Sequence, residues 1–189
     1  MRQVKLLALM TALSMTLCSC GAGQTAEEKA LEIQAEYAAW DTLTVTADVT
    51  ADYGDRVYDF KLRYTGNHTE GTVEVLEPEE IAGLSATVSP DGDALIYDGA
   101  ELSLGELTTD GLSPMKCIPM MIGNWSEGYI GRAETGSIDG TDSLAVTYTL
   151  SESEYLVTWF EYDTNLPIRS EIYFDGNMVL YCEFENIIT

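Results

Sequence analysis

Residues 43–50 have the sequence LTVTADVT, in which every second residue is apolar. In a β-strand the leucine, the valines and the alanine would share one face, and the threonines and the aspartate would share the other. Residues 58–64, YDFKLRY, alternate in the same way. We therefore expect two strands of a sheet that buries one face and exposes the other face to solvent.

Turn signals separate further short apolar segments along the chain. Pro90-Asp91-Gly92-Asp93 and Asp175-Gly176-Asn177 are typical of tight turns between neighbouring strands. The apolar segments predict strands at residues 73–75, 84–88, 95–97, 102–104, 144–150, 155–162, 168–174 and 178–184. Successive strands that are joined by short turns form an antiparallel meander.

Two segments do not alternate in this way. In residues 27–40, Ile33, Tyr37 and Trp40 recur at the spacing of one helix face, which predicts an amphipathic helix. Residues 111–131 are rich in apolar side chains without a period of two, which predicts one or two short helices, or an ordered loop, that cross the sheet. The expected fold class is α+β: a curved antiparallel sheet with the amino-terminal helix and the helical crossing on its concave face.

The composition excludes several classes of protein. The chain has 189 residues, with 32 acidic and 9 basic side chains and a net charge of −23. That charge leaves no basic face to neutralise phosphates, so a general nucleic-acid binder is excluded. His68 is the single histidine, so metal sites and catalytic sites that use several histidines are excluded. We expect no cofactor and no bound metal ion.

The amino terminus has the pattern of an export signal. Arg2 and Lys5 precede residues 6–17, a mainly apolar run of 12 residues that is too short to span a bilayer as a helix. The sequence Leu17-Cys18-Ser19-Cys20 resembles the bacterial lipobox. That resemblance implies cleavage before Cys20, lipidation of the Cys20 thiol and anchoring by the attached acyl chains, and two such chains are enough for stable attachment.

The expected organisation of the chain follows from this cleavage. It consists of a signal peptide at residues 1–19, the lipidated cysteine and a tether at residues 20–26, and a single domain at residues 27–189. The leader contains two of the basic residues and none of the acidic ones, so its removal changes the net charge to −25. The expected location is the extracytoplasmic face of the cell membrane.

Several motifs, taken in their order along the chain, resemble those of LolA-like lipoprotein carriers. They are the first helix running into Trp40-Asp41-Thr42-Leu43, the segment 58–64, the stretch from Leu84 to Gly99, Leu112-Ser113-Pro114, and the segment from Tyr162 to Ile168. The resemblance extends to clostridial lipoproteins, including GerS-type germination lipoproteins. It implies an incomplete β-barrel whose helices close an apolar cavity.

An apolar ligand of such a protein would lie between the helices and the sheet. Methionine side chains adapt their shape, and Met115, Met120 and Met121 lie together in the predicted crossing. This segment is either a lid over a lipid-sized cavity or a well-packed part of the core. The candidate ligand-binding residues are Tyr37, Trp40, Phe60, Leu62, Met120, Met121, Trp125 and Phe174.

Alternate strand residues are expected to fill the concave face. On the early strands these are Phe60, Leu62 and Tyr64, and on the late strands they are either Ile172 and Phe174 or Leu180 and Phe184. None of these side chains carries a charge, so a ligand held among them would have to be apolar.

The sequence contains few candidates for catalysis. His68 lies in a turn, and no Gly-x-Ser-x-Gly motif accompanies it, which argues against a Ser-His-Asp hydrolase. Acidic pairs such as Asp139 and Asp142 lie in turns, where aspartate bonds to the backbone, and they lack the spacing of a calcium loop. We therefore expect no catalytic residues and no enzyme.

Cys117 and Cys182 are the thiols that follow Cys20. In an exported protein an even pair permits a disulfide, which would join the crossing segment to the last strand. The alternative is two separate buried cysteines. The sequence does not decide between the two, because it does not fix the distance between the residues.

Two functional hypotheses follow from these features. The first is a membrane-anchored lipoprotein that binds an apolar ligand, such as an acyl chain, in a half-barrel cavity. The second is a non-enzymatic interaction protein that docks and regulates an envelope or spore cell-wall enzyme, as the germination-type resemblance implies. An open cavity favours the first hypothesis, and a filled one favours the second.

Overall fold

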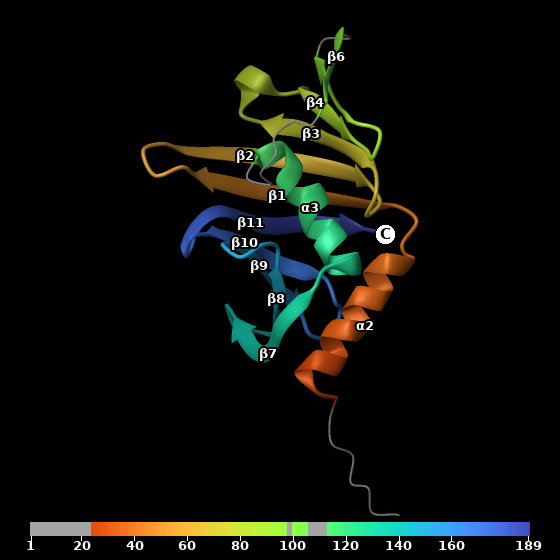
Figure 1. Ribbon diagram of the computed structural model, residues 1–189, viewed down its shortest axis with the longest axis vertical. Helices are drawn as coiled ribbons and strands as arrows, with labels where there is room; N and C mark the ends of the chain where they lie inside the picture. The colour runs from red at the N-terminus through yellow and green to blue at the C-terminus, as the bar shows by residue number, and fades with distance from the viewer. Residues whose placement is uncertain (1–23, 98–99, 106–112) are drawn as a thin grey trace, which may run out of the picture.

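The computed structural model describes residues 24–97, 100–105 and 113–189. These residues form a curved, unclosed antiparallel sheet of eleven strands with two α-helices on its concave face (Figure 1). The strands are β1 (Leu43–Asp52), β2 (Val57–Gly66), β3 (Gly71–Glu77), β4 (Ser85–Val88), β5 (Asp93–Tyr97), β6 (Ala100–Gly105), β7 (Ile130–Ile138), β8 (Thr141–Thr149), β9 (Glu154–Glu161), β10 (Pro167–Phe174) and β11 (Asn177–Ile188). The helices are α2 (Ala26–Ala39) and α3 (Pro114–Glu127), and a short 3-10 helix, η2 (Glu79–Ile81), joins β3 to β4.

The order of the strands explains why a helix crosses the sheet. The order is β6-β5-β4-β3-β2-β1-β11-β10-β9-β8-β7. Strands β1 to β6 therefore step from the centre to one edge, and strands β7 to β11 step back from the opposite edge until β11 pairs with β1. Between β6 and β7 the chain has to pass from one edge to the other, and α3 lies in that passage (Figure 1).

Helix α2 is fixed by its first turn and by its buried face. The hydroxyl of Thr25 accepts a hydrogen bond from the backbone N–H of Glu28, and the Glu28 carboxylate accepts one from the backbone N–H of Thr25. This capping box satisfies two backbone donors that the helix itself cannot pair. Ala30, Ile33 and Tyr37 are fully buried, where the helix packs against α3, β7 and β8.

Helix α3 is stabilised chiefly by burial. Pro114 occupies its first turn, where the fixed backbone angle of proline suits a helix start. Pro119 removes one backbone hydrogen bond from the interior of the helix. The apolar face offsets this loss, since Cys117, Ile118, Met121, Ile122 and Trp125 are all completely buried against the rest of the core.

The structure confirms the predicted fold class and corrects some of its elements. The crossing segment is a single helix of 14 residues rather than a loop. Strand β7 was not predicted, because it is an edge strand in which only Ala133 and Ile138 are buried, so its sequence shows no apolar alternation. The predicted turn at residues 98–99 and the leader with Cys20 lie outside the described residues.

Candidate functional site: the two faces of the sheet

Aromatic side chains fill the space between the helices and the sheet. Trp125 of α3 lies against Tyr37 of α2, Phe160 of β9 and Phe184 of β11, with distances of 5.2, 5.7 and 5.4 Å between ring centroids. The rings meet edge to face, which is an arrangement that aromatic pairs prefer. The cluster thereby joins both helices to the strands of the late half of the sheet.

The polar atoms of this cluster have partners. The indole N–H of Trp125 donates to the Thr158 hydroxyl at 2.9 Å, and the hydroxyls of Thr158 and Ser170 are 2.7 Å apart. The hydroxyl of Tyr37 donates to the backbone carbonyl of Asn165 at 3.1 Å. Burial raises the pKa of Tyr37 well above its ordinary value. These bonds fix the orientation of both rings, because a buried donor that lost its partner would cost free energy.

Seven of the eight predicted ligand-binding residues lie together in this core. Tyr37, Leu62, Met121 and Trp125 are at most 1% exposed, whereas Trp40, Phe60 and Met120 are half-buried and pack against the same cluster. The residues expected to gather on the concave face therefore do so, and they pack against one another.

The expectation that Phe174 fills the concave face is wrong. Phe174 is the last residue of β10, and its position beside the hairpin turn leaves it 38% exposed and outside the core. Ile172 and Leu180 are buried in the core instead, and Phe184 packs against Trp125. The alternation predicted that Phe174 points inward, but Phe174 lies at the end of β10, beyond the part of the strand that the core covers.

Cys117 and Cys182 face each other across the interface between α3 and β11. Their sulfur atoms are 3.9 Å apart, both residues are completely buried, and both thiols are free. The hydrogen bond between the two thiols and their burial raise the pKa of Cys182 well above its ordinary value. The two cysteines are thus buried neighbours, although the sequence could not show that they meet.

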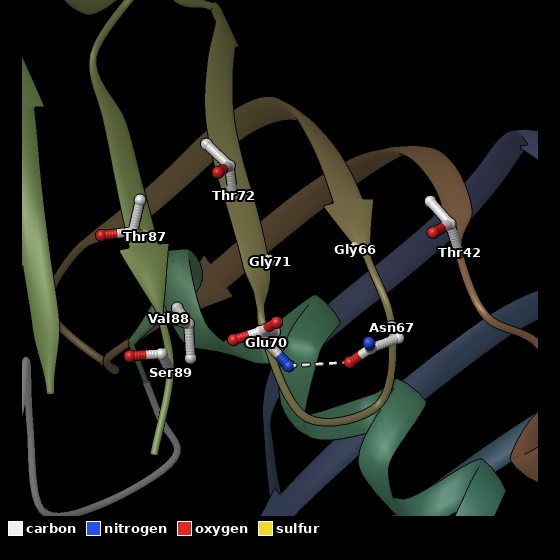
Figure 2. A pocket seen from close by; sticks show the side chains of 9 residues that line it. All are labelled: Thr42, Gly66, Asn67, Glu70, Gly71, Thr72, Thr87, Val88 and Ser89. Carbon is white, nitrogen blue, oxygen red and sulfur yellow. Dashed lines mark hydrogen bonds between the residues drawn. The ribbon is translucent and has the colours of Figure 1, made fainter. Parts of the chain in front are cut away.

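A polar groove of about 370 Å³ lies beside the turn between β2 and β3 (Figure 2). The side-chain oxygen of Asn67 accepts hydrogen bonds from the backbone N–H groups of Thr69 and Glu70, at 2.8 and 2.9 Å. A side chain at Gly71 would clash with the Tyr64 ring, which explains the glycine at this place. The groove is lined by Thr42, Gly66, Asn67, Glu70, Gly71, Thr72, Thr87, Val88 and Ser89, and the contacts among these residues serve to fold the turn.

His68 lies in the same turn, as the sequence predicts, but it is not fully solvated. Its side chain is 28% exposed, and its Nε2 atom lies 3.8 Å from the carboxylate of Glu127 at the end of α3. The backbone carbonyl of His68 also lies close to Gly123 of α3. His68 therefore packs the turn against the helix.

The face of the sheet opposite to α2 and α3, called the outer face below, carries a second set of aromatic side chains. Residues that lie directly opposite each other in an antiparallel pair point to the same face. The register therefore defines two rows across this face: Lys61, Asp48, Glu183, Arg169 and Trp159 in one, and Asp59, Thr50, Tyr181, Glu171 and Val157 in the next.

The aromatic side chains of the outer face are held in place by stacking. The Arg169 guanidinium lies 4.4 Å from the ring centroid of Trp159 and 5.7 Å from that of Tyr181. The rings of Tyr155 and Tyr173 are nearly parallel, at an angle of 9° and a distance of 4.6 Å. All four aromatic residues are half-buried, so each ring presents part of its surface to solvent.

Carboxylates further order these tyrosines. The Tyr173 hydroxyl donates to Glu171 at 2.7 Å, and the Tyr181 hydroxyl donates to Glu183. The hydrogen bond to Glu171 is the main cause that raises the pKa of Tyr173 to about 12. Both hydroxyls are therefore protonated donors at neutral pH.

Two acidic grooves, of about 420 and 560 Å³, flank the aromatic rows. The acidic residues that line them are Asp48, Asp59 and Glu77 in the first groove, and Glu152, Glu154 and Asp175 in the second. The Lys61 ammonium lies 2.6 Å from Glu185 and 3.5 Å from Asp48. It lowers the pKa of Glu185, whereas burial raises the pKa of Asp48. One cation is shared by two carboxylates, so the first groove is net acidic.

The outer face was missed in the sequence, although a signal was present. In β9 the buried residues Leu156 and Phe160 alternate with Tyr155, Val157 and Trp159, so apolar residues occupy both faces of the strand. In β1 the outward positions carry only threonine and aspartate. Large apolar residues at outward positions are unusual for a face that only meets water.

Further features of the described residues concern metals and membranes. Within residues 24–97, 100–105 and 113–189, no cluster of three or more His, Cys, Asp or Glu side chains could hold a metal ion. The helices in this part of the chain are too short or too polar to cross a membrane.

No family model matches the sequence, and no curated protein matches it. The fold is similar to a solved domain from Vibrio parahaemolyticus that is described as an outer membrane lipoprotein-sorting protein, with 11% identity, coverage of 87% of this chain and 93% of that chain, and a TM-score of 0.51. It is also similar to a LolA superfamily protein from Nitrosomonas europaea, with 12% identity, coverage of 87% and 93%, and a TM-score of 0.45. A chain in the structure of the CwlD amidase from Clostridioides difficile in complex with the GerS lipoprotein shares 15% identity over 88% of this chain and 96% of that chain, with a TM-score of 0.45. With its curved, unclosed antiparallel sheet and two helices, this chain therefore has the LolA-like fold.

Proposed function

We propose that this chain is a membrane-anchored, extracytoplasmic and non-enzymatic interaction protein that docks a protein partner of the cell envelope. The observation that supports this proposal is the filled concave face. Trp125, Met121, Ile118 and Ile122 of α3 are completely buried between the helix and the sheet. An acyl chain would have to displace these side chains, and each one displaced would lose the free energy of its burial.

The envelope location rests on the leader. The lipobox-like sequence before Cys20 would place the domain on a short tether outside the membrane. A cell-wall enzyme is the class of partner that the sequence resemblance to germination-type lipoproteins suggests.

A second candidate function, binding of an apolar ligand, is favoured by one observation. Trp40, Phe60 and Met120 are only half-buried at the border of the core, so part of their apolar surface faces solvent. Methionine can change rotamer to admit a ligand. An acyl chain could then enter beside α3 if the helix moved outward.

Native mass spectrometry of the protein purified from its own membrane tests the two functions against each other. We expect it to retain a partner protein and no non-covalent lipid beyond the anchor. Displacement of a fluorescent fatty acid, measured on residues 21–189, should show no saturable binding. Saturable binding that is lost in Met120→Glu, while circular dichroism shows an intact fold, would replace the docking function with ligand binding.

A further inference from the structure

We propose that the outer face of β9, β10 and β11 is the docking surface for this partner, and that the partner is a protein with a basic surface. This inference rests on the proposed function and adds the location of the site and the chemistry of its occupant. Its starting point is the difference between the two halves of one sheet. Both halves turn the same face to solvent, but among the residues whose side chains the structure describes, the partly exposed rings of this face lie in the late half.

The rings form a pre-ordered apolar surface. Stacking on Arg169 fixes Trp159, and mutual stacking fixes Tyr155 and Tyr173. Side chains that are already ordered lose little conformational freedom when a partner covers them. Tyrosine, tryptophan and arginine are also the residues that contribute most of the binding energy in protein interfaces.

The charge around the rings selects the sign of the partner. The basic residues of the two rows, Lys61 and Arg169, are already in ion pairs, with Glu185 at 2.6 Å and with Glu171 at 3.3 Å. The grooves on either side are lined by three carboxylates each. The surface is thus an aromatic centre with acidic flanks, which steers basic proteins toward it and repels acidic ones.

The open, convex shape of the face favours a protein over a small molecule. The rows run across strands β2, β1, β11, β10 and β9, so the side chains form a broad surface rather than an enclosed pocket. A small ligand is normally enclosed by its site, whereas a protein partner covers a broad surface that has an apolar centre and a polar rim.

Site-specific photo-cross-linking in the anchored, full-length protein tests the location. A benzophenone amino acid replaces Tyr155 or Tyr173 on the outer face, and it replaces Leu31 or Tyr129 as matched controls. The control residues are 58% and 73% exposed and lie on α2 and just after α3. We expect irradiation of intact cells to join one protein to the outer-face positions, with at least a tenfold lower yield at the control positions. Mass spectrometry should identify a protein of basic isoelectric point.

Charge reversal tests the chemistry. Glu77→Lys together with Glu152→Lys places a positive charge in each groove, and both residues are exposed. Cross-linking from Tyr173 should fall at least tenfold in this variant. The control Glu127→Lys reverses a single charge at the end of α3, where the Glu127 side chain is 75% exposed, and it should leave the yield within twofold.

The outcomes separate this inference from the proposed function. Cross-links from Leu31 or Tyr129 alone would overturn the outer-face site and leave the docking function standing. An acidic protein captured at Tyr173 would overturn the charge argument. If a folded, anchored protein gives no cross-link at any of the four positions and native mass spectrometry finds no partner, both the site and the function are wrong.

Discussion

Trp125 of α3 connects several elements of the fold. Its ring meets α2, β9 and β11, and its N–H reaches the Thr158 hydroxyl inside the sheet. One side chain therefore supplies both apolar packing and the partner of a buried polar atom. Such residues are sensitive to truncation because no neighbour can take over both contributions.

Truncation of Trp125 should be the most costly single change in the core. We expect Trp125→Ala to lower the free energy of unfolding by about 3–5 kcal/mol, and Trp125→Phe, which keeps a ring but removes the donor, by about 1–3 kcal/mol. Urea unfolding at neutral pH measures both. Trp159→Ala on the outer face is the control, and since Trp159 is half-buried its loss should stay within about 1–2 kcal/mol. Equal losses for Trp125→Ala and Trp159→Ala would contradict this description of the core.

Tyr148 shows a different consequence of burial. It is completely buried, and within the described part of the chain its hydroxyl has no hydrogen-bond partner. Desolvation raises its pKa well above the ordinary value of 10.0. The hydroxyl thus costs stability at neutral pH, and its ionisation is suppressed only in the folded state.

We expect Tyr148→Phe to leave stability at pH 7 unchanged, or to raise it by up to about 1 kcal/mol. Above pH 10 the unfolded chain releases the tyrosine proton and the folded chain keeps it, so the wild-type stability should fall as pH rises. A single such group contributes up to about 1.4 kcal/mol per pH unit, and Tyr148→Phe should remove that contribution. Unfolding curves between pH 8 and 12 measure the slope. An unchanged slope in Tyr148→Phe, or an equal change in the exposed control Tyr129→Phe, would refute the assignment.

At the scale of elements, helix α3 and strand β11 could be joined by a disulfide bond. Cys117 and Cys182 lie on these two elements with their sulfur atoms 3.9 Å apart. A disulfide has a bond length of about 2.05 Å, so the two sulfur atoms would have to move closer together for the bond to form. Both thiols are inaccessible in the closed fold, so the bond would have to form by exchange with an external disulfide oxidant before α3 packs.

We predict that the exported protein contains this disulfide. It would close a loop between residues 65 positions apart, which in the chain-entropy model stabilises the fold by about 4 kcal/mol. Peptide mapping without reductant should find the cross-linked pair, and a reductant should lower the melting temperature. The Cys117→Ala variant should melt at the same temperature with and without reductant. If Cys117 and Cys182 are both alkylated when the membrane-bound protein is unfolded without reductant, the disulfide is excluded.

At the scale of the whole molecule, the net charge and the expected leader both bear on how the domain would be attached to the membrane. The expected mature chain has a net charge of −25, so anionic lipid headgroups should repel the domain rather than hold it. Attachment to the membrane would then depend on the acyl chains alone. Cys20 itself lies outside the described residues.

Cys20→Ala should therefore release the protein from the membrane. We expect the variant in the soluble fraction after a carbonate wash, because no thiol remains to carry the anchor. The control Cys18→Ala should stay in the membrane fraction, since Cys18 lies in the signal peptide that the expected cleavage removes. Retention of Cys20→Ala on washed membranes would mean that another part of the protein supplies the attachment.

Much of the fold could be predicted because local patterns and burial agree there. The outward threonines of β1 and the inward leucine, valines and alanine gave the sheet its buried face, and the spacing of Ile33 and Tyr37 gave the first helix its apolar side. Strand β7 could not be predicted in this way. Its place at the edge removes the burial that produces alternation, and only its hydrogen bonds to β8 define it.

The residues of the candidate site also differ in whether local patterns could predict their positions. The gathering of Tyr37 and Leu62 on the concave face followed from periodicity, since each lies on an apolar stripe. The position of Phe174 did not, because alternation records the side of a strand and not how far the core extends along it. Whether the concave face is filled depends on how α3 lies across the strands, which no local pattern contains.

The sequence by itself determined which residues of β1 and of α2 turn inward, because that pattern is encoded over a few consecutive positions. The tertiary structure alone decided which distant residues meet. It placed Cys117 against Cys182 and Trp125 against Thr158. It also aligned Trp159, Arg169 and Glu183 in one row of the outer face. Such contacts depend on strand order and register, which are set by packing the whole sheet at once rather than by any segment of it.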